Sequence, residues 1–287
     1  MTTPPTTAPP ADNEATRERP HAVILSLDAE RVARRVLLIC VLAELALFLL
    51  DYHVNYARAT NIGAIRRLFN TAREDGLASW FGTTQTLLAA LTLWLTYLIA
   101  RPQPKPRWWK AAWLALALFF TYMAIDDGAE LHERLGTTVD ALKEDSSALL
   151  TSFPSYTWQV LFLPFFGAFG LFMLVFLWKE LDSRSSRLVL VSAIGCLALA
   201  VVLDFFEGLE PDHALNVHTY IAENTNFDAR SQARFARSGY DTLQHFSRST
   251  EETLEMLAIS LLWFLFLRNL PRVARGGLQV RFEPKRD

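Results

Sequence analysis

The chain has 287 residues, of which 51% are hydrophobic and 20% charged, and its net charge is -2. This near-neutral balance excludes the strongly basic composition of many nucleic-acid-binding proteins, so no nucleic-acid partner is expected. The two cysteines, Cys40 and Cys196, both lie in apolar stretches, which excludes a disulfide framework. Apolar residues gather in long blocks with most of the charge between them, the hydropathy pattern of a membrane protein.

The first 28 residues are rich in Pro and Thr and predict a disordered cytoplasmic tail. They lack the charged start, apolar run and small-residue cleavage site of a signal peptide, so we expect the first span to act as a retained insertion signal. Asp28 is a predicted N-cap for a helix that runs through Arg34 and Arg35 into the first apolar block.

A hydrocarbon core of about 30 Å requires about 20 helical residues, and six segments of that size follow one another. The fold class is therefore predicted to be all-α, a polytopic transmembrane helical bundle over residues 29–270, followed by a basic cytoplasmic tail over 271–287. The six predicted spans are residues 35–55, 80–100, 110–133, 158–179, 187–207 and 249–268.

Basic residues in the connections predict the orientation, because positive charge is retained in the cytoplasm. They concentrate before the first span, between the second and third, between the fourth and fifth, and after the sixth. Both termini are therefore expected in the cytoplasm, with the chain in a bacterial inner membrane and the lipid bilayer as its partner. The third outward segment, 208–247, is the longest, and its spacing predicts a helix over residues 228–250 that could act as a lid.

Acidic side chains recur on four spans at similar depth near the outward ends. Residues three, four or seven apart share one face of a helix, so depth and helical phase select the acids expected to face the interior. The selected residues are Glu44 and Asp51 in the first span, Asp126 and Glu130 in the third, Asp204 and Glu207 in the fifth, and Glu255 in the sixth.

A charge near the middle of the bilayer costs about 2.5 to 3.5 kcal/mol on insertion scales, so these acids require protons, water or a metal ion. Glu130, Glu207 and Glu255 are the candidate catalytic residues, and Glu44 and Asp51 are candidates for a proton or ion relay. Oxygen donors favour Ca²⁺, Mg²⁺ or Mn²⁺ over Zn²⁺. The candidate metal ligands are Asp126, Glu130, Asp204, Glu207, Glu252 and Glu255.

Three histidines could join these ligands: His132, His218 and His245. In a continuous helix His132 lies about 200° around the axis from Glu130, which places it off the shared face. The simpler alternative is that the acids are solvated helix ends, paired as Glu130 with Arg134 and Glu252 with Arg248.

The stretch from Ile125 to Glu133, Ile-Asp-Asp-Gly-Ala-Glu-Leu-His-Glu, resembles segments of uncharacterised bacterial multipass inner-membrane proteins with an acidic pair followed by His-Glu at a span end. That resemblance implies no particular activity. The chain is also similar to the alkaline ceramidase and receptor-hydrolase superfamily in having a polar site within helices. It departs from that family's His-x-x-x-His pair by carrying Glu251, Glu252 and Glu255 in the last span, which argues against a zinc amidase.

Three functions remain open. The first is a metal-dependent membrane hydrolase acting on a lipid or lipid-linked substrate. The second is a proton- or cation-coupled transporter or channel, with Glu44 as the deep relay residue. The third is a non-catalytic assembly or sensory subunit, in which the acids fix helix packing.

Overall fold

A computed structural model describes residues 28–141 and 153–275, and every secondary-structure element in those two ranges is a helix. The prediction of an all-α fold is therefore confirmed for this part of the chain. The predicted tails, 1–28 and 271–287, lie almost wholly outside it. Five of the described helices are long and apolar enough to cross a membrane: α3 (Leu77–Ala100), α4 (Arg107–Ala129), α7 (Thr157–Glu180), α8 (Arg184–Glu207) and α11 (Gly239–Val273).

Helix α1 (Ala29–Leu50) is not among those five, and it carries Arg34, Arg35 and Glu44 along its length. Its N-cap is Asp28, whose carboxylate accepts the backbone N–H of Arg31 at 3.1 Å, as predicted. The helix continues without a break into a wider π-helical turn, η1 (Asp51–Tyr56). Such turns are rare and often lie at functional or strained positions.

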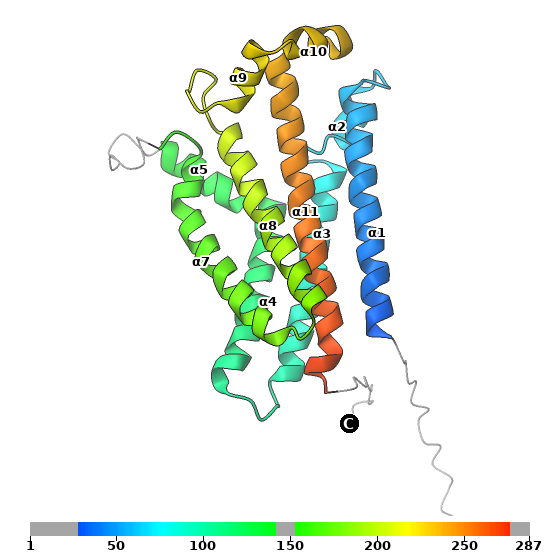
Figure 1. Cartoon of the computed structure of the whole chain (residues 1–287), viewed down its shortest axis with the longest axis vertical. Helices are drawn as coiled ribbons and strands as arrows, with labels where there is room; N and C mark the ends of the chain where they lie inside the picture. Colours follow the sequence, from blue (N-terminus) through cyan, green and yellow to red (C-terminus); the bar gives the residue numbers. More distant parts are fainter. Residues whose placement is uncertain (1–27, 142–152, 276–287) are drawn as a thin grey trace, which may run out of the picture.

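The long helices run side by side, with α11 between α1 and α8 (Figure 1). Helices α3 and α4 form a packed pair, and α3 also packs on α11. The start of α1 and the end of α11 lie at one end of the bundle (Figure 1). The opposite end carries α2 (Gly63–Leu68), α5 (Leu131–Ala141), α9 (Val217–Asn224) and α10 (Phe227–Phe235), and we call it the cap end.

The apolar core fills the half of the bundle away from the cap end. Trp113, Leu116 and Phe120 of α4 pack there with Leu262 and Phe266 of α11, all almost fully buried. Core side chains of α3, α7 and α8 belong to the same cluster. The outer faces of α7 and α8 instead leave large apolar side chains uncovered, as expected of helices that contact lipid.

Hydroxyl and indole groups connect the helices inside this half. Thr92 Oγ1 donates to the carbonyl of Leu88 one turn back and accepts from Trp263 Nε1 of α11 at 3.0 Å. Thr121 of α4 accepts from Trp94 of α3, also at 3.0 Å. Such bonds satisfy polar groups that would otherwise be unpaired in an apolar medium.

The segment leading into α11 folds back on itself, so the predicted continuous helix over residues 228–250 is wrong. Helix α10 ends at Phe235, and the next residue, Ala236, has a left-handed backbone with φ 53°. Helix α11 begins at Gly239, whose N–H donates to Asp228 Oδ1 at 2.6 Å. A Cβ at Gly239 would lie 2.8 Å from the Asp228 Cα, so the close return of the chain requires glycine there.

Candidate functional site

The site is organised by a backbone turn between α4 and α5. Helix α4 ends at Ala129, and Glu130 follows with φ 52° and ψ 40°, a left-handed conformation uncommon for a residue other than glycine. Its N–H still donates to the Asp126 carbonyl at 2.7 Å. The helix predicted to continue to residue 133 is therefore interrupted, and α5 leaves in a new direction.

The turn brings His132 onto Asp126. The buried Asp126 carboxylate accepts the His132 backbone N–H at 2.9 Å and contacts ring atom Nδ1 at 2.8 Å. The helical-phase argument, which placed His132 away from the acidic face, is wrong because it assumed an unbroken helix. Burial lowers the pKa of His132, but the hydrogen bond and charge of Asp126 outweigh that effect and raise it. We call this carboxylate and ring the Asp126–His132 pair.

Trp158 of α7 packs beside the Asp126–His132 pair. Its ring meets His132 edge to face, with centroids 4.7 Å apart. Gly136 makes the contact between α5 and α7 close, because a Cβ there would lie 3.0 Å from Trp158 Cβ and 3.1 Å from its backbone N.

Three carboxylates gather on the other side of the turn. Glu74, from the loop before α3, meets Glu130 and Glu133, and one oxygen of each lies within 4.8 Å of the others. Burial, the hydrogen bond with Glu130 and the charge of Glu133 raise the pKa of Glu74 to about 8. Atom Oε2 of Glu74 is buried without a hydrogen-bond partner. We call these residues the glutamate triad; they offer the hard oxygen ligands that Ca²⁺, Mg²⁺ and Mn²⁺ prefer.

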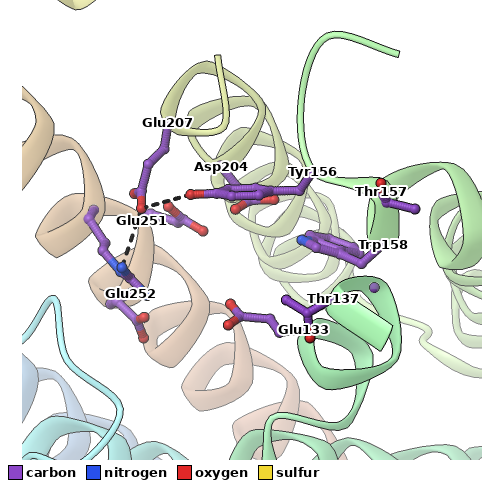
Figure 2. A pocket seen from close by; sticks show the side chains of 11 residues that line it. Glu133, Thr137, Tyr156, Thr157, Trp158, Asp204, Glu207, Glu251 and Glu252 are labelled. Atoms are coloured by element: carbon purple, nitrogen blue, oxygen red, sulfur yellow. Dashed lines mark hydrogen bonds and ion pairs between the residues drawn. The ribbon is translucent and has the colours of Figure 1, made fainter. Parts of the chain in front are cut away.

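A pocket of about 160 Å³ adjoins the triad at the cap end (Figure 2). Side chains of α5, α7, α8 and α11 converge on it, and its wall holds five carboxylates and one guanidinium. The lining residues are Glu133, Gly136, Thr137, Tyr156, Thr157, Trp158, Asp204, Glu207, Arg248, Glu251 and Glu252.

Arg248 joins the pocket to the triad. Its guanidinium lies 3.3 Å from Glu74 Oε1 and 3.3 Å from Glu207 Oε1. The predicted partner of Arg248 was Glu252, but its ion pairs in the structure are with Glu74 and Glu207. One cation thus stands between two groups of acids and offsets only part of their charge.

Tyr156 and Gln159 hold the acids of α8. The Tyr156 hydroxyl donates to Glu207 Oε1 at 3.3 Å, and the Gln159 amide donates to Asp204 Oδ2 at 2.7 Å. Burial and the charges of Glu207 and Asp204 raise the pKa of Tyr156, so it remains a donor. The second oxygen of Glu207, Oε2, is buried and has no partner.

Glu44 and Asp51 lie apart from the pocket in two separate hydrogen-bond networks. Glu44 is 2% exposed and accepts from Ser260 at 2.6 Å and Gln85 at 3.1 Å. Asp51 is fully buried and contacts Ser249 at 2.7 Å, His245 at 3.0 Å and Asn55 at 2.7 Å. Both networks attach α1 to α11.

The remaining candidates divide as follows. Asp204, Glu207 and Glu252 line the pocket, whereas Glu255 is exposed and does not line it. Neither His218, which packs edge to face on Tyr240, nor His245 is part of the lining.

Glu133 follows Glu130 by three residues, a spacing that shares one face of a helix, and Glu251 stands one residue before Glu252 in the last predicted span. The spacing of the sequence therefore favours Glu133 as a residue of the site. Glu74, Tyr156 and Trp158 come from connections and a helix start, where no periodicity indicates the direction of a side chain. No sequence signal selects them.

The sequence model of a protein family described as a domain of unknown function, DUF8692, matches residues 35–270. This range includes the five candidate spans almost entirely, the glutamate triad and every residue of the pocket lining. None of the curated proteins and none of the solved structures compared with the chain matches it.

Proposed function

The chain belongs to the DUF8692 family, and from the geometry of its pocket we propose that it binds a divalent cation at the glutamate triad and hydrolyses a substrate in the adjoining pocket. One observation carries the proposal. The turn at Glu130 places a three-carboxylate group on one side of the chain and a carboxylate-held histidine on the other. Glu133 of the first group lines the pocket, and Trp158, whose ring packs on His132, lines it as well.

The triad fits a divalent cation because its charge is poorly compensated. Three carboxylates with oxygens within 4.8 Å of one another repel, and among the described residues their ion pairs are Arg134 with Glu130 and Arg248 with Glu74, each at 3.3 Å. The unpartnered Glu74 Oε2 is a free ligand atom. A bound divalent ion would polarise a substrate oxygen and lower the pKa of a coordinated water.

His132 is suited to act as a general base. Because Asp126 binds Nδ1, the neutral ring presents Nε2 as its free nitrogen for a proton from water. Asp126 also fixes the ring through the His132 backbone N–H, so the pair enters the reaction already oriented. Arg248, which lines the pocket, is placed to stabilise negative charge that develops on a substrate.

We further propose six spans, with α1 as the first. Its outer face leaves Leu38, Ile39, Leu42 and Leu45 more than half exposed, which suits contact with lipid. It starts at the end of the bundle where α11 finishes, so six crossings return the chain to the side on which it began (Figure 1). The basic connections lie at that end, and we propose that it faces the cytoplasm of a bacterial cell, with the cap end outside the inner membrane.

The packing below the pocket favours an enzyme over a channel. Within the described ranges, the half of the bundle away from the cap end is filled by one apolar cluster that draws on α3, α4, α7, α8 and α11. An open ion path needs polar groups or water along its length, and this cluster separates the pocket from the opposite end.

The metal proposal is tested by titrating the purified full chain with Mn²⁺ and counting bound ions by electron paramagnetic resonance. We expect about one bound ion per chain, and at least tenfold weaker binding in Glu133→Gln. Glu223→Gln, an exposed acid of α9, is the matched control and should bind as the unmodified chain does. A chain that binds no Mn²⁺, Mg²⁺ or Ca²⁺ would overturn the metal proposal.

The hydrolytic proposal is tested separately, with lipid esters and lipid phosphodiesters presented to the chain in nanodiscs. We expect turnover of at least one class that depends on added divalent ion. A chain that binds Mn²⁺ and turns over neither class would contradict the hydrolase and leave a cation-binding protein.

A further inference from the structure

We infer that the pocket recognises a zwitterionic lipid headgroup, in which a phosphodiester oxygen accepts a hydrogen bond from Trp158 and an ammonium group lies against Asp204 and Glu207. This inference rests on the proposed function of the same site and names its substrate class.

The first observation is an unpartnered donor. Trp158 is 9% exposed, and the polar atom of its side chain, Nε1, has no hydrogen-bond partner. Figure 2 shows the nitrogen edge of the indole facing the space between Glu133 and the acids of α8. An indole N–H can only donate, and a buried donor without an acceptor destabilises the empty pocket. A ligand that fills the pocket must therefore bring an acceptor oxygen to this edge.

The second observation is an excess of acceptors on the opposite wall. Asp204 and Glu207 of α8 and Glu251 and Glu252 of α11 meet there, with Arg248 as the cation of the lining. A divalent ion at the glutamate triad would leave the charge of this wall offset by Arg248, the one cation of the lining, which pairs with Glu207 at 3.3 Å. Glu207 Oε2 is buried without a donor, and a primary ammonium brings three donors and one positive charge.

Together the two walls define one ligand. The ligand must carry an acceptor oxygen for Trp158 and a cation a few bonds away for Asp204 and Glu207. An amino-alcohol phosphodiester has both groups. Its phosphate oxygens also suit Arg248 and a divalent ion at the triad. A polyamine lacks the acceptor for Trp158, and an anionic headgroup lacks the cation for Asp204 and Glu207.

Size and position agree with a headgroup. The pocket of about 160 Å³ is several times the roughly 30 Å³ that one water occupies in the liquid. It lies where α7 and α11 approach the cap end and where α8 ends, so a lipid headgroup can reach it while its acyl chains stay in the bilayer. Hydrolysis adds the oxygen of water to phosphorus, breaks one P–O ester bond, and passes the proton of water through His132 to the departing alkoxide.

The test is a calorimetric titration of the full chain with glycerophosphoethanolamine, with and without Mn²⁺. Trp158→Phe keeps the ring and removes the N–H, and we expect binding about tenfold weaker. Trp108→Phe is the matched control, because Trp108 lies at the far end of the bundle and is 62% exposed. Equal binding by these two variants would overturn the role of Trp158.

The ammonium is tested by comparison with glycerophosphate, which has the phosphate but no amine. We expect Asp204→Asn to weaken the binding of glycerophosphoethanolamine and to leave the binding of glycerophosphate unchanged. Equal affinity of the two compounds for the unmodified chain would overturn the cation subsite. Spermidine is the third compound. If it binds as tightly as glycerophosphoethanolamine, and equally tightly to Trp158→Phe, the pocket is a site for free polyamines and the headgroup proposal is overturned.

Binding measurements with lipid nanodiscs distinguish a membrane lipid from a free soluble compound as the source of the headgroup. Binding of phosphatidylethanolamine but not phosphatidylglycerol supports a lipid, whereas binding of the soluble compound alone overturns the lipid source. Mn²⁺ binding is measured on the same samples, and Trp158→Phe should retain it. Loss of headgroup recognition with intact Mn²⁺ binding therefore counts against this inference alone, and absent Mn²⁺ binding counts against the proposed function.

Discussion

The backbone conformation of Glu130 determines which side chains meet at the candidate site. Its left-handed φ of 52° turns the chain so that Glu130 and Glu133 meet Glu74, while His132 meets Asp126. In an unbroken helix His132 would lie about 200° from Glu130 around the axis. The glutamate triad and the Asp126–His132 pair are separate groups because of this turn.

Cation binding should depend on pH through Glu74. A proton and a metal ion compete for this carboxylate, whose pKa is raised to about 8 by burial and by Glu130 and Glu133. Below that pH the proton occupies the site, so affinity should rise with pH, by up to about tenfold per unit, and level off above about pH 8. Mn²⁺ titrations between about pH 6 and 9 measure this slope.

Glu74→Gln should flatten that slope and weaken binding, because no ionisable group remains at the position. Glu223→Gln, exposed on α9, should keep the slope of the unmodified chain. A slope that is unchanged in Glu74→Gln would assign the competing proton to another residue.

The Asp126–His132 pair should affect turnover more than binding. His132→Gln removes the general base, and we expect kcat for the hydrolysed lipid to fall about 100-fold or more. Asp126→Asn should also lower kcat, because the amide no longer holds Nδ1 as a carboxylate does. Mn²⁺ affinity should change less than threefold in His132→Gln, and a loss of Mn²⁺ binding equal to that of Glu133→Gln would instead make His132 a ligand.

At the scale of elements, the contact between α5 and α7 depends on Gly136. A side chain there would meet the Trp158 backbone N at 3.1 Å, and backbone cannot move aside as a flexible side chain can. We expect Gly136→Ala to destabilise the fold by about 1 to 3 kcal/mol and to weaken glycerophosphoethanolamine binding by displacing Trp158. Gly195→Ala in α8 is the control, since a Cβ there meets nothing within 4 Å. Thermal unfolding in detergent compares the two, and equal midpoints would refute the close contact.

Asp51 makes polar contacts with α11 near the cap end, just after the last residue of α1. Asp51→Ala would leave His245 and Ser249 without their buried partner, and we expect a loss of about 3 kcal/mol of stability. Mn²⁺ affinity should be unchanged, because Asp51 does not line the pocket. Chemical unfolding measures the effect against Asp212→Ala, an exposed acid after α8. Lost Mn²⁺ binding in Asp51→Ala would connect this network to the metal site.

The orientation of the whole molecule is tested with single cysteines in a chain that carries Cys40→Ser and Cys196→Ser. An impermeant maleimide added to spheroplasts should label Asp212→Cys at the cap end and leave Lys105→Cys, in the connection between α3 and α4, unlabelled until the cells are lysed. The reverse pattern would contradict the proposed topology.

The sequence predicts the helices better than it predicts the site. Predicted spans 80–100 and 187–207 fall within α3 and α8, because a long apolar block can bury its backbone polar groups only as a helix. The end of α4 was missed because Ala129, Glu130 and Leu131 give no glycine signal for a left-handed turn. Depth and helical phase selected two acids that line the pocket, Asp204 and Glu207, but counting along one helix cannot place a loop residue such as Glu74.

The two networks that join α1 to α11 have a consequence for synthesis. Glu44 bonds to Ser260, 216 residues later, and Asp51 bonds to Ser249, 198 residues later. Residues emerge from the ribosome in order, so α1 is made first among the described helices and α11 last. Until α11 is inserted, Glu44 and Asp51 lack the hydroxyl and imidazole donors that satisfy them in the finished bundle. Insertion of α11 therefore completes the hydrogen bonds that stabilise α1 in the bundle. A chain that stops before α11 should be a substrate for membrane proteolysis.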